Sequence, residues 1–176
     1  MEQETERDFN ASAHTYVGSA DMSIGFKIAL THQAHVLPEM GIIVEAFVPA
    51  GSDHFTADET LPRVAWTYAW EIGEGLLLEG QTMIARKLDH YTDEAYSEFS
   101  QAVGVKAELI DDLLASYVEW YALAPHSADT EHTQHVFEGG FMVLLTRNLQ
   151  WDVEAGVGLN DAAHDYFVGT GFSYRR

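Results

Sequence analysis

The chain has 176 residues, with 28 acidic and 9 basic side chains, a net charge of −19 and no cysteine. This length suits one domain. The charge excludes a nucleic-acid partner, because phosphate binding needs clustered cations. The missing thiols exclude disulfides and thiolate chemistry. No run approaches the roughly 18 apolar residues of a membrane helix, and residues 1–8 lack the pattern of a secretory signal. We expect residues 1–10 to be a disordered or extended N-terminal segment and residues 11–176 to form the domain.

Along most of the chain, apolar side chains alternate with polar or small ones, as in strands that face two environments. The alternation is strict over 22–30 and looser over 40–48, and over 63–71 it places Val64, Trp66, Tyr68 and Trp70 on one face. It continues over 76–87, 96–109, 114–123, 134–146, 149–159 and 165–175, with Gln101 as a misfit. A weaker strand over 11–18 would give the even number that a closed antiparallel barrel prefers.

Turn residues at Gly73, Asp111-Asp112 and Arg147-Asn148 predict short connections, whereas 49–61, 88–95 and 125–133 predict longer loops. Short turns at one end and long loops at the other are typical of a transmembrane barrel. Residues 106–121 also fit a helical spacing, but their β-favouring aromatic and branched side chains favour a hairpin. The sequence therefore predicts an all-β fold, a closed antiparallel up-and-down barrel of the transmembrane type with about ten strands.

The glycines indicate which face of the barrel lies inside. Six of them share faces with charged side chains, and glycine favours bent or crowded barrel walls. The lumen-lining residues that we predict on this basis are Lys27, Glu45, Arg63, Glu71, Glu79, Glu98, Lys106, Glu119, Glu138, Asp152, Glu154 and Arg175. They would form either an ion-pair network that plugs a narrow barrel or an acidic passage that disfavours anions. Aromatic side chains on the opposite faces predict a lipid boundary at Trp66, Trp70, Trp151, Tyr166 and Tyr174.

Several segments of the chain resemble one family, the outer-membrane proteins of the phenol-degradation meta-pathway that are described as transporters. The most specific segments are Gly139-Gly140-Phe141, Leu149-Gln150-Trp151-Asp152-Val153, 156–163, 165–169 and 171–175. Weaker likenesses occur at 24–27, 49–52, 68–70 and 117–120. The resemblance implies an outer-membrane barrel that moves hydrophobic or aromatic compounds, and it supplies no catalytic residues. The short length, the lack of a signal and the ending Arg175-Arg176 suggest a truncated or redesigned member.

Catalytic and metal-binding patterns are weak. His126, His132 and His135 with Asp129 and Glu131 match no compact ligand spacing, and Asp53, His54, Asp58 and Glu59 lack the glycine and terminal glutamate of a calcium loop. No Gly-x-Ser-x-Gly elbow frames a nucleophile, and no phosphate-binding glycine loop leads from a strand into a helix. We therefore expect no catalytic residues, no metal and no cofactor, and hence no enzyme.

The sequence leaves three functions open. The first is a bacterial outer-membrane barrel that passes small, hydrophobic or aromatic molecules, with a lipid bilayer or detergent and a small solute as partners. The second is a soluble barrel that binds an apolar ligand in its interior, since alternation alone does not tell which face is buried. The third is a structural or designed barrel without transport. The sequence leaves the oligomeric state open.

Overall fold

The computed structural model describes residues 2–7, 13–52, 55–89, 92 and 94–175, and the side chains from residue 17 onward within these ranges. These residues form strands, turns and loops, and none of them forms a helix, so the described part of the chain holds no helix able to cross a membrane. The strands are β1 (Glu2–Arg7), β2 (Ala13–Gly18), β3 (Met22–Thr31), β4 (Glu39–Val48), β5 (Leu61–Glu71), β6 (Leu76–Leu88), β7 (Ala95–Ile110), β8 (Leu114–His126), β9 (Gln134–Thr146), β10 (Leu149–Gly158) and β11 (Tyr166–Tyr174).

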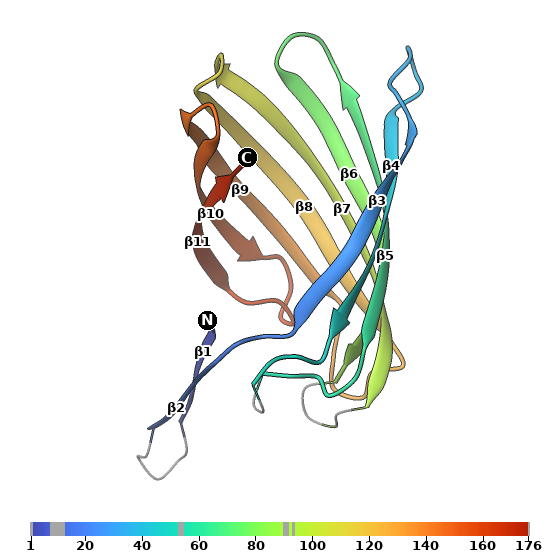
Figure 1. Cartoon of the computed structure of the whole chain (residues 1–176), viewed down its shortest axis with the longest axis vertical. Coiled ribbons are helices and arrows are strands. Elements are labelled where there is room, and N and C mark those ends of the chain that lie inside the picture. The colour runs from blue at the N-terminus through green and yellow to red at the C-terminus, as the bar shows by residue number, and fades with distance from the viewer. Residues whose placement is uncertain (1, 8–12, 53–54, 90–91, 93, 176) are drawn as a thin grey trace.

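Strands β3 to β11 form one nine-stranded sheet in which each strand pairs with the next one along the chain. Every pair is antiparallel, so the sheet is an up-and-down meander. Figure 1 shows this sheet curling into a tall wall around an interior. The fold is therefore all-β and up-and-down, as the sequence predicts.

The prediction of a closed ten-stranded barrel is not confirmed. Among the described residues, β3 and β11 are the two edges of the sheet and do not pair with each other. The expected tenth strand exists as β2, but it pairs with β1 in a separate two-stranded sheet, which lies below the wall in Figure 1. Because nine strands alternate in direction, β3 and β11 run parallel, and an antiparallel closure needs one more strand between them. We call the gap between these two edges the seam.

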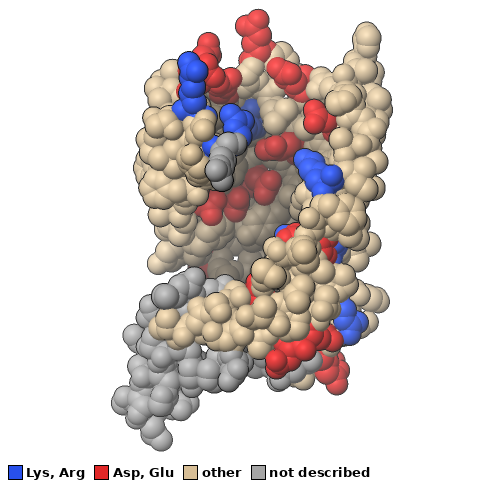
Figure 2. Space-filling view, viewed as in Figure 1, with Lys and Arg blue, Asp and Glu red and all other residues tan. Residues whose placement is uncertain are grey.

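The two faces of the sheet have opposite polarity, as the alternation predicts. The register places Ile24, Phe26 and Ile28 of β3 on the same face as Val44 and Val64 of the next two strands. The exposed large apolar side chains of the wall strands follow this convex face around the sheet: Met22, Ile24, Phe26, Ile28, Leu30, Val64, Trp66, Leu76, Ile84, Phe99, Val103, Val105, Leu109, Val118, Phe137, Phe141, Leu145, Val157, Tyr166, Val168, Phe172 and Tyr174. Apart from Arg86, the charged residues of the wall strands occupy the concave face, and Figure 2 shows acidic side chains inside the hollow.

The connections confirm the predicted difference between the two ends. Residues 72–75, 111–113 and 147–148 make short turns at one end, where the longer connection 32–38 also lies, whereas 49–60, 89–94, 127–133 and 159–165 separate the strands at the other end. The helical alternative for 106–121 is wrong, since β7 and β8 form a hairpin around Asp111, Asp112 and Leu113. Asp112 adopts a positive φ of 55° in that turn, a conformation that aspartate tolerates better than most residues.

Candidate functional site on the concave face

The predicted lumen residues share one face of the wall. Cross-strand pairs such as Glu45 with Arg63, and Glu119 with Glu138, link the charged positions directly, and the alternation places the other eight on the same side. Glu71 ends its strand at the short-turn end, and Arg175 follows the last residue of β11. The other ten members of the set lie within the strands, from the long-loop end to the short-turn end of the face.

Most of the inward acids lie opposite a glycine on a neighbouring strand. Register partners include Glu45 with Gly25, Glu79 and Glu119 with Gly104, Glu138 with Gly156, Glu154 with Gly140 and Gly169, and Asp152 with Gly171. A Cβ added at Gly169 would lie 2.6 Å from Glu154 Oε1, and one added at Gly171 would lie 2.8 Å from Asp152 Oδ2. The carboxylates therefore occupy space that any larger side chain opposite them would fill.

The inner faces of β8, β9 and β10 are acidic and aromatic. Glu119 and Glu138 are direct cross-strand neighbours, and the hydroxyl of Tyr117 donates a hydrogen bond to Glu154 Oε2 at 2.8 Å. Among the described residues, no cluster of histidine, aspartate and glutamate has the geometry of a metal site. This arc is therefore a negatively charged wall with hydroxyl groups.

Within the strands, the cations of the concave face lie on β3 to β7, outside that wall. Arg63 Nε donates to Glu45 Oε2 at 2.7 Å, and Lys87 Nζ lies 2.9 Å from Glu98 Oε1. Both cations are therefore neutralised by a neighbouring acid, whereas the arc of β8 to β10 has no cation of its own among its described inward positions. The lumen consequently carries an excess of negative charge on one side.

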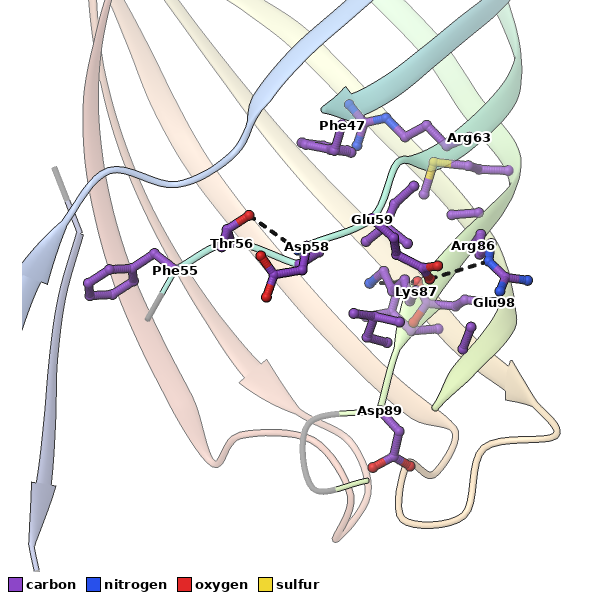
Figure 3. A pocket seen from close by; sticks show the side chains of 17 residues that line it. Phe47, Phe55, Thr56, Asp58, Glu59, Arg63, Arg86, Lys87, Asp89 and Glu98 are labelled. Carbon is purple, nitrogen blue, oxygen red and sulfur yellow. Dashed lines mark hydrogen bonds and ion pairs between the residues drawn. The ribbon is translucent and has the colours of Figure 1, made fainter. Parts of the chain in front are cut away.

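A large hollow of about 1200 Å³ opens at the long-loop end of the concave face. Apolar side chains of four strands line it, namely Phe47, Leu61, Met83, Ala85 and Leu123, together with Arg63, Lys87 and Glu98. The loop segment from Phe55 to Glu59 forms its other side, and Figure 3 shows this segment crossing the mouth of the wall. The next hollow, of about 490 Å³, lies deeper between Lys27, Glu79 and Glu119.

Asp21 fixes the loop that crosses the mouth. Its Oδ1 accepts hydrogen bonds from the backbone N–H groups of Ala50 and Gly51, both at 3.0 Å, and its Oδ2 accepts one from Ala57 at 2.9 Å. These bonds lower the pKa of Asp21 below its ordinary value of 3.8, the one from Ala57 most strongly. The loop between β4 and β5 is thus tied to the residue that precedes β3.

Two further side chains tie the long loops to one another. Asp89, only 1 % exposed, accepts hydrogen bonds from the N–H of Thr130 at 2.9 Å and from its hydroxyl at 2.6 Å. Asn160 donates to the carbonyl of Thr133 at 2.7 Å and accepts from the N–H of His135 at 3.0 Å. The sequence analysis missed Asp21, Asp89 and Asn160 as anchors because their partners lie 25 to 41 residues away.

The predicted lipid-boundary aromatics lie on the convex face. Tyr166 and Tyr174, at the two ends of β11, are 75 % and 71 % exposed. The indole N–H of Trp70 donates to the carbonyl of Val36 at 2.9 Å, and that of Trp151 donates to Thr170 Oγ1 at 2.8 Å. Trp66 differs from the others because it lies in the middle of its strand.

Gln101, the misfit of the sequence pattern, belongs to a polar cluster on this apolar face. Its Nε2 donates to the hydroxyl of Tyr68 at 2.8 Å, and its Oε1 accepts from Thr82 Oγ1 at 2.7 Å. Gly80 makes room for the ring of Tyr68, since a Cβ there would lie 2.5 Å from a ring carbon. The cluster satisfies its own hydrogen bonds, which makes an apolar surrounding tolerable.

The histidine and acid groups considered for metals do not assemble. His135 stacks on Trp120 with ring centroids 5.8 Å apart, on the convex side of the sheet, and no metal cluster forms within the described ranges. Asp53 and His54 lie outside the described residues. Phe47, Leu61, Met83 and Leu123, which line the loop-end hollow, escaped the sequence analysis because apolar residues on a polar face carry no recognisable spacing.

A comparison with family models matches residues 2–175 to the family described as "Putative MetA-pathway of phenol degradation". No curated protein matches the chain. The match covers the wall strands together with the N-terminal hairpin.

Proposed function

The chain belongs to the family described as a putative MetA-pathway of phenol degradation, and from this premise we propose that it is an outer-membrane β-barrel through which small molecules pass. The premise connects the chain by name with the breakdown of an aromatic compound. The proposal adds a location, the bacterial outer membrane, and a non-enzymatic role. Both rest on physical arguments from the two faces of the wall.

The observation that carries the proposal is the apolar convex face. Large exposed side chains lie on every strand from β3 to β11 except β4, with a single one each on β8 (Val118) and β10 (Val157). A soluble monomer rarely exposes a contiguous apolar surface of this extent, whereas a lipid bilayer would cover it. A soluble barrel that binds an apolar ligand inside would need the reverse polarity, so the alternative function is disfavoured.

We propose further that β2 closes the seam once the protein is in a membrane. A strand between β3 and β11 would pair antiparallel with both, because those two edges run in the same direction. Only residues 19–21 separate β2 from β3, a length typical of a hairpin connection. Closure would also satisfy the backbone groups of both edges, which hydrocarbon cannot do.

Closure of the seam by a second copy of the chain is less favourable than closure by β2. In a two-fold assembly around the barrel axis, β3 of one copy would meet β11 of the other in a parallel pair. Parallel neighbours are not found elsewhere in this meander. The strand that closes the seam should therefore run antiparallel to both β3 and β11, and β2 can adopt this direction.

The lining of the lumen favours neutral or cationic solutes over anions. Acids outnumber cations on the concave face, and the arc of β8 to β10 carries Glu119, Glu138, Asp152 and Glu154 without a cation beside them on those strands. Rings of acidic side chains select cations in pores. Short turns would face the periplasm and the long loops the exterior, as in other barrels of this type.

The test compares the purified full chain in plain buffer, in detergent and in liposomes. We expect aggregation without detergent, a β-type circular dichroism spectrum with heat-modifiable gel mobility in detergent, and solute flux or conductance in liposomes. A monodisperse protein in plain buffer would refute the membrane assignment. Correct insertion without any flux would leave a structural barrel and remove the passage.

The closure has its own test, which uses the absence of cysteine from the chain. Val17 is a described residue of β2, and Val168 lies on the convex face of β11 at the same long-loop end. A V17C/V168C variant in liposomes should be cross-linked within one chain by a short bifunctional thiol reagent. Cross-links between chains only, or none in protein that is inserted, would refute closure by β2.

A further inference from the structure

The loop between β4 and β5 turns back over the mouth of the wall. Its described segment from Phe55 to Glu59, which we call the strap, lines one side of the loop-end hollow, and strands β4 to β8 line the other side. The wall side carries apolar residues such as Phe47 and Met83 and charged residues such as Arg63 and Lys87. Figure 3 shows the strap running across the hollow from Phe55 to Glu59. A solute that enters through the hollow passes between the strap and the wall.

Asp21 holds the middle of the strap. Its Oδ2 accepts a hydrogen bond from the N–H of Ala57 at 2.9 Å, and its Oδ1 accepts bonds from Ala50 and Gly51, both at 3.0 Å. Hydrogen bonds to a carboxylate are stronger than those between neutral groups. Gly51 also lies against the backbone before β3, since a Cβ there would lie 2.7 Å from the carbonyl oxygen of Ser19. We call the three bonds to Asp21 the latch, because they tie the strap to the residue that precedes β3.

The two ends of the strap have contacts of their own. The ring of Phe55 covers Gly18, the last residue of β2, where an added Cβ would lie 2.5 Å from a ring carbon. At the other end, Glu59 Oε1 lies 3.5 Å from Arg86 Nε. The strap is therefore held at both ends as well as in the middle, so these contacts determine how far it reaches over the hollow.

Asp58 is the charge that the strap brings to the mouth. Its side chain is exposed and lines the hollow. Arg63, Arg86 and Lys87, the cations of the hollow, each form an ion pair with another acid, and no described lysine or arginine pairs with Asp58. The mouth therefore carries a negative charge without a neighbouring cation. Asp58 has a positive φ of 55°, a conformation that asparagine tolerates as well, so D58N removes the charge without straining the strap.

We propose that the strap is the constriction that selects solutes at the mouth: its latched position limits their size, and the carboxylate of Asp58 favours cations over anions. The inference rests on the proposed function and names the residues that determine its selectivity. Release of the latch widens the mouth without moving the strands, because Ala50, Gly51 and Ala57 all lie in the loop between β4 and β5. Size and charge selection therefore depend on different residues and can be changed separately.

The size limit is tested by D21A, which removes the acceptor of all three latch bonds. Loss of a hydrogen bond to a charged group raises the fraction of molecules with a released strap roughly tenfold or more. In swelling assays with phosphatidylcholine liposomes, raffinose should therefore enter roughly tenfold faster or more through D21A than through the wild type, while the smaller sugar arabinose enters at a similar rate. D161A is the matched control, because Asp161 is an exposed acid in another loop at the same end and does not line the hollow.

The position of the strap is tested by attaching a bulky group to it after folding. The chain has no cysteine, so an introduced thiol is the one site for a maleimide that carries a polyethylene glycol chain. Labelled A57C should lose nearly all of its arabinose flux, since Ala57 lines the hollow. Labelled A162C should keep its flux, because Ala162 is half-buried like Ala57 but lies in the loop after β10, outside the hollow.

The charge preference is tested by D58N. Its cation-to-anion permeability ratio, obtained from liposome reversal potentials, should fall toward one, while its ratio of raffinose to arabinose entry stays at the wild-type value. D161N removes the same charge from the other loop and should leave both ratios unchanged. An unaltered permeability ratio in D58N would overturn the role of Asp58.

Failure of this inference is distinguishable from failure of the proposed function. If the wild type admits arabinose, but D21A with heat-modifiable mobility keeps the same size limit or labelled A57C stays open, the strap is not the constriction and the passage stands. If the wild type admits no solute, the passage fails and the latch is judged in detergent. There the amide hydrogen of Ala57 should exchange roughly tenfold faster or more in D21A than in the wild type. An unchanged exchange rate would overturn the latch.

Discussion

Replacing Val103 by lysine tests which face of the wall meets lipid. Val103 lies near the middle of β7 on the convex face, 39 % exposed, with Trp120 and Gly80 as its neighbours across the sheet. A lysine on the lipid face at the bilayer midplane costs about 2–4 kcal/mol. This corresponds to a roughly 30- to 700-fold smaller folding equilibrium constant. If the same face met water, the change would be an ordinary surface substitution, within about 0.5 kcal/mol.

The matched control is Q81K, which places the same charge at the same depth but on the concave face. Gln81 is the register partner of Ala102, the residue before Val103, and it lines the hollow that contains Glu79 and Glu119. A lysine there has space and acidic neighbours, so we expect a change within about 0.5 kcal/mol. Urea unfolding from lipid vesicles, followed by tryptophan fluorescence, measures both variants. Equal effects of V103K and Q81K, or a larger loss for Q81K, would refute the orientation of the two faces.

Three further predictions concern single side chains. The stabilisation by Asp21 is complete above its ordinary pKa of 3.8 and is lost as the pH falls through the lower pKa of the folded state. The urea midpoint of the wild type should therefore fall at acidic pH more than the midpoint of D21N. Parallel curves of midpoint against pH for the two proteins would contradict this. G80A should displace the ring of Tyr68 and cost about 1–3 kcal/mol, and an unchanged unfolding midpoint would contradict the contact. E138Q should reduce the preference for cations over anions in liposome reversal potentials, and an unaltered preference would exclude this acid from the passage.

The strand pattern was predictable because the two faces of each strand differ in polarity. Alternation at two-residue spacing is a local property, so it locates strands such as Met22–Thr31 and Leu149–Gly158 without any knowledge of their partners. The turn at Asp111 and Asp112 was also local, because the residues on either side favour strands. The helical reading of 106–121 failed since the alternation of β7 and β8, interrupted by a turn, mimics helical spacing over a short window.

The closure of the sheet and the loop-end hollow were not predictable in the same way. Whether Ala13–Gly18 pairs with β3 or with Glu2–Arg7 depends on the competition between two antiparallel partners, and both produce the same local pattern. The hollow is defined by residues such as Phe47 and Leu123, which are 76 positions apart and violate the polar pattern of their own face. Departures from a pattern indicate that a position has another role, but they do not tell which residues meet.

The pairing of acids with glycines connects the geometry of the wall with the proposed passage. Glu154 faces glycine on both neighbouring strands, at Gly140 and Gly169, so its carboxylate lies along the wall, over Gly169, where it also accepts the hydrogen bond from Tyr117. A wall built this way keeps charge at its surface while preserving the width of the interior.

A G169L variant should therefore push the carboxylate of Glu154 toward the centre and narrow the passage. We expect lower conductance with the cation preference retained, because the charge remains in the lumen. Lower conductance together with a lost preference would mean that the leucine displaces Glu154 out of the passage, and the acid–glycine pairs would then serve the packing of the sheet alone.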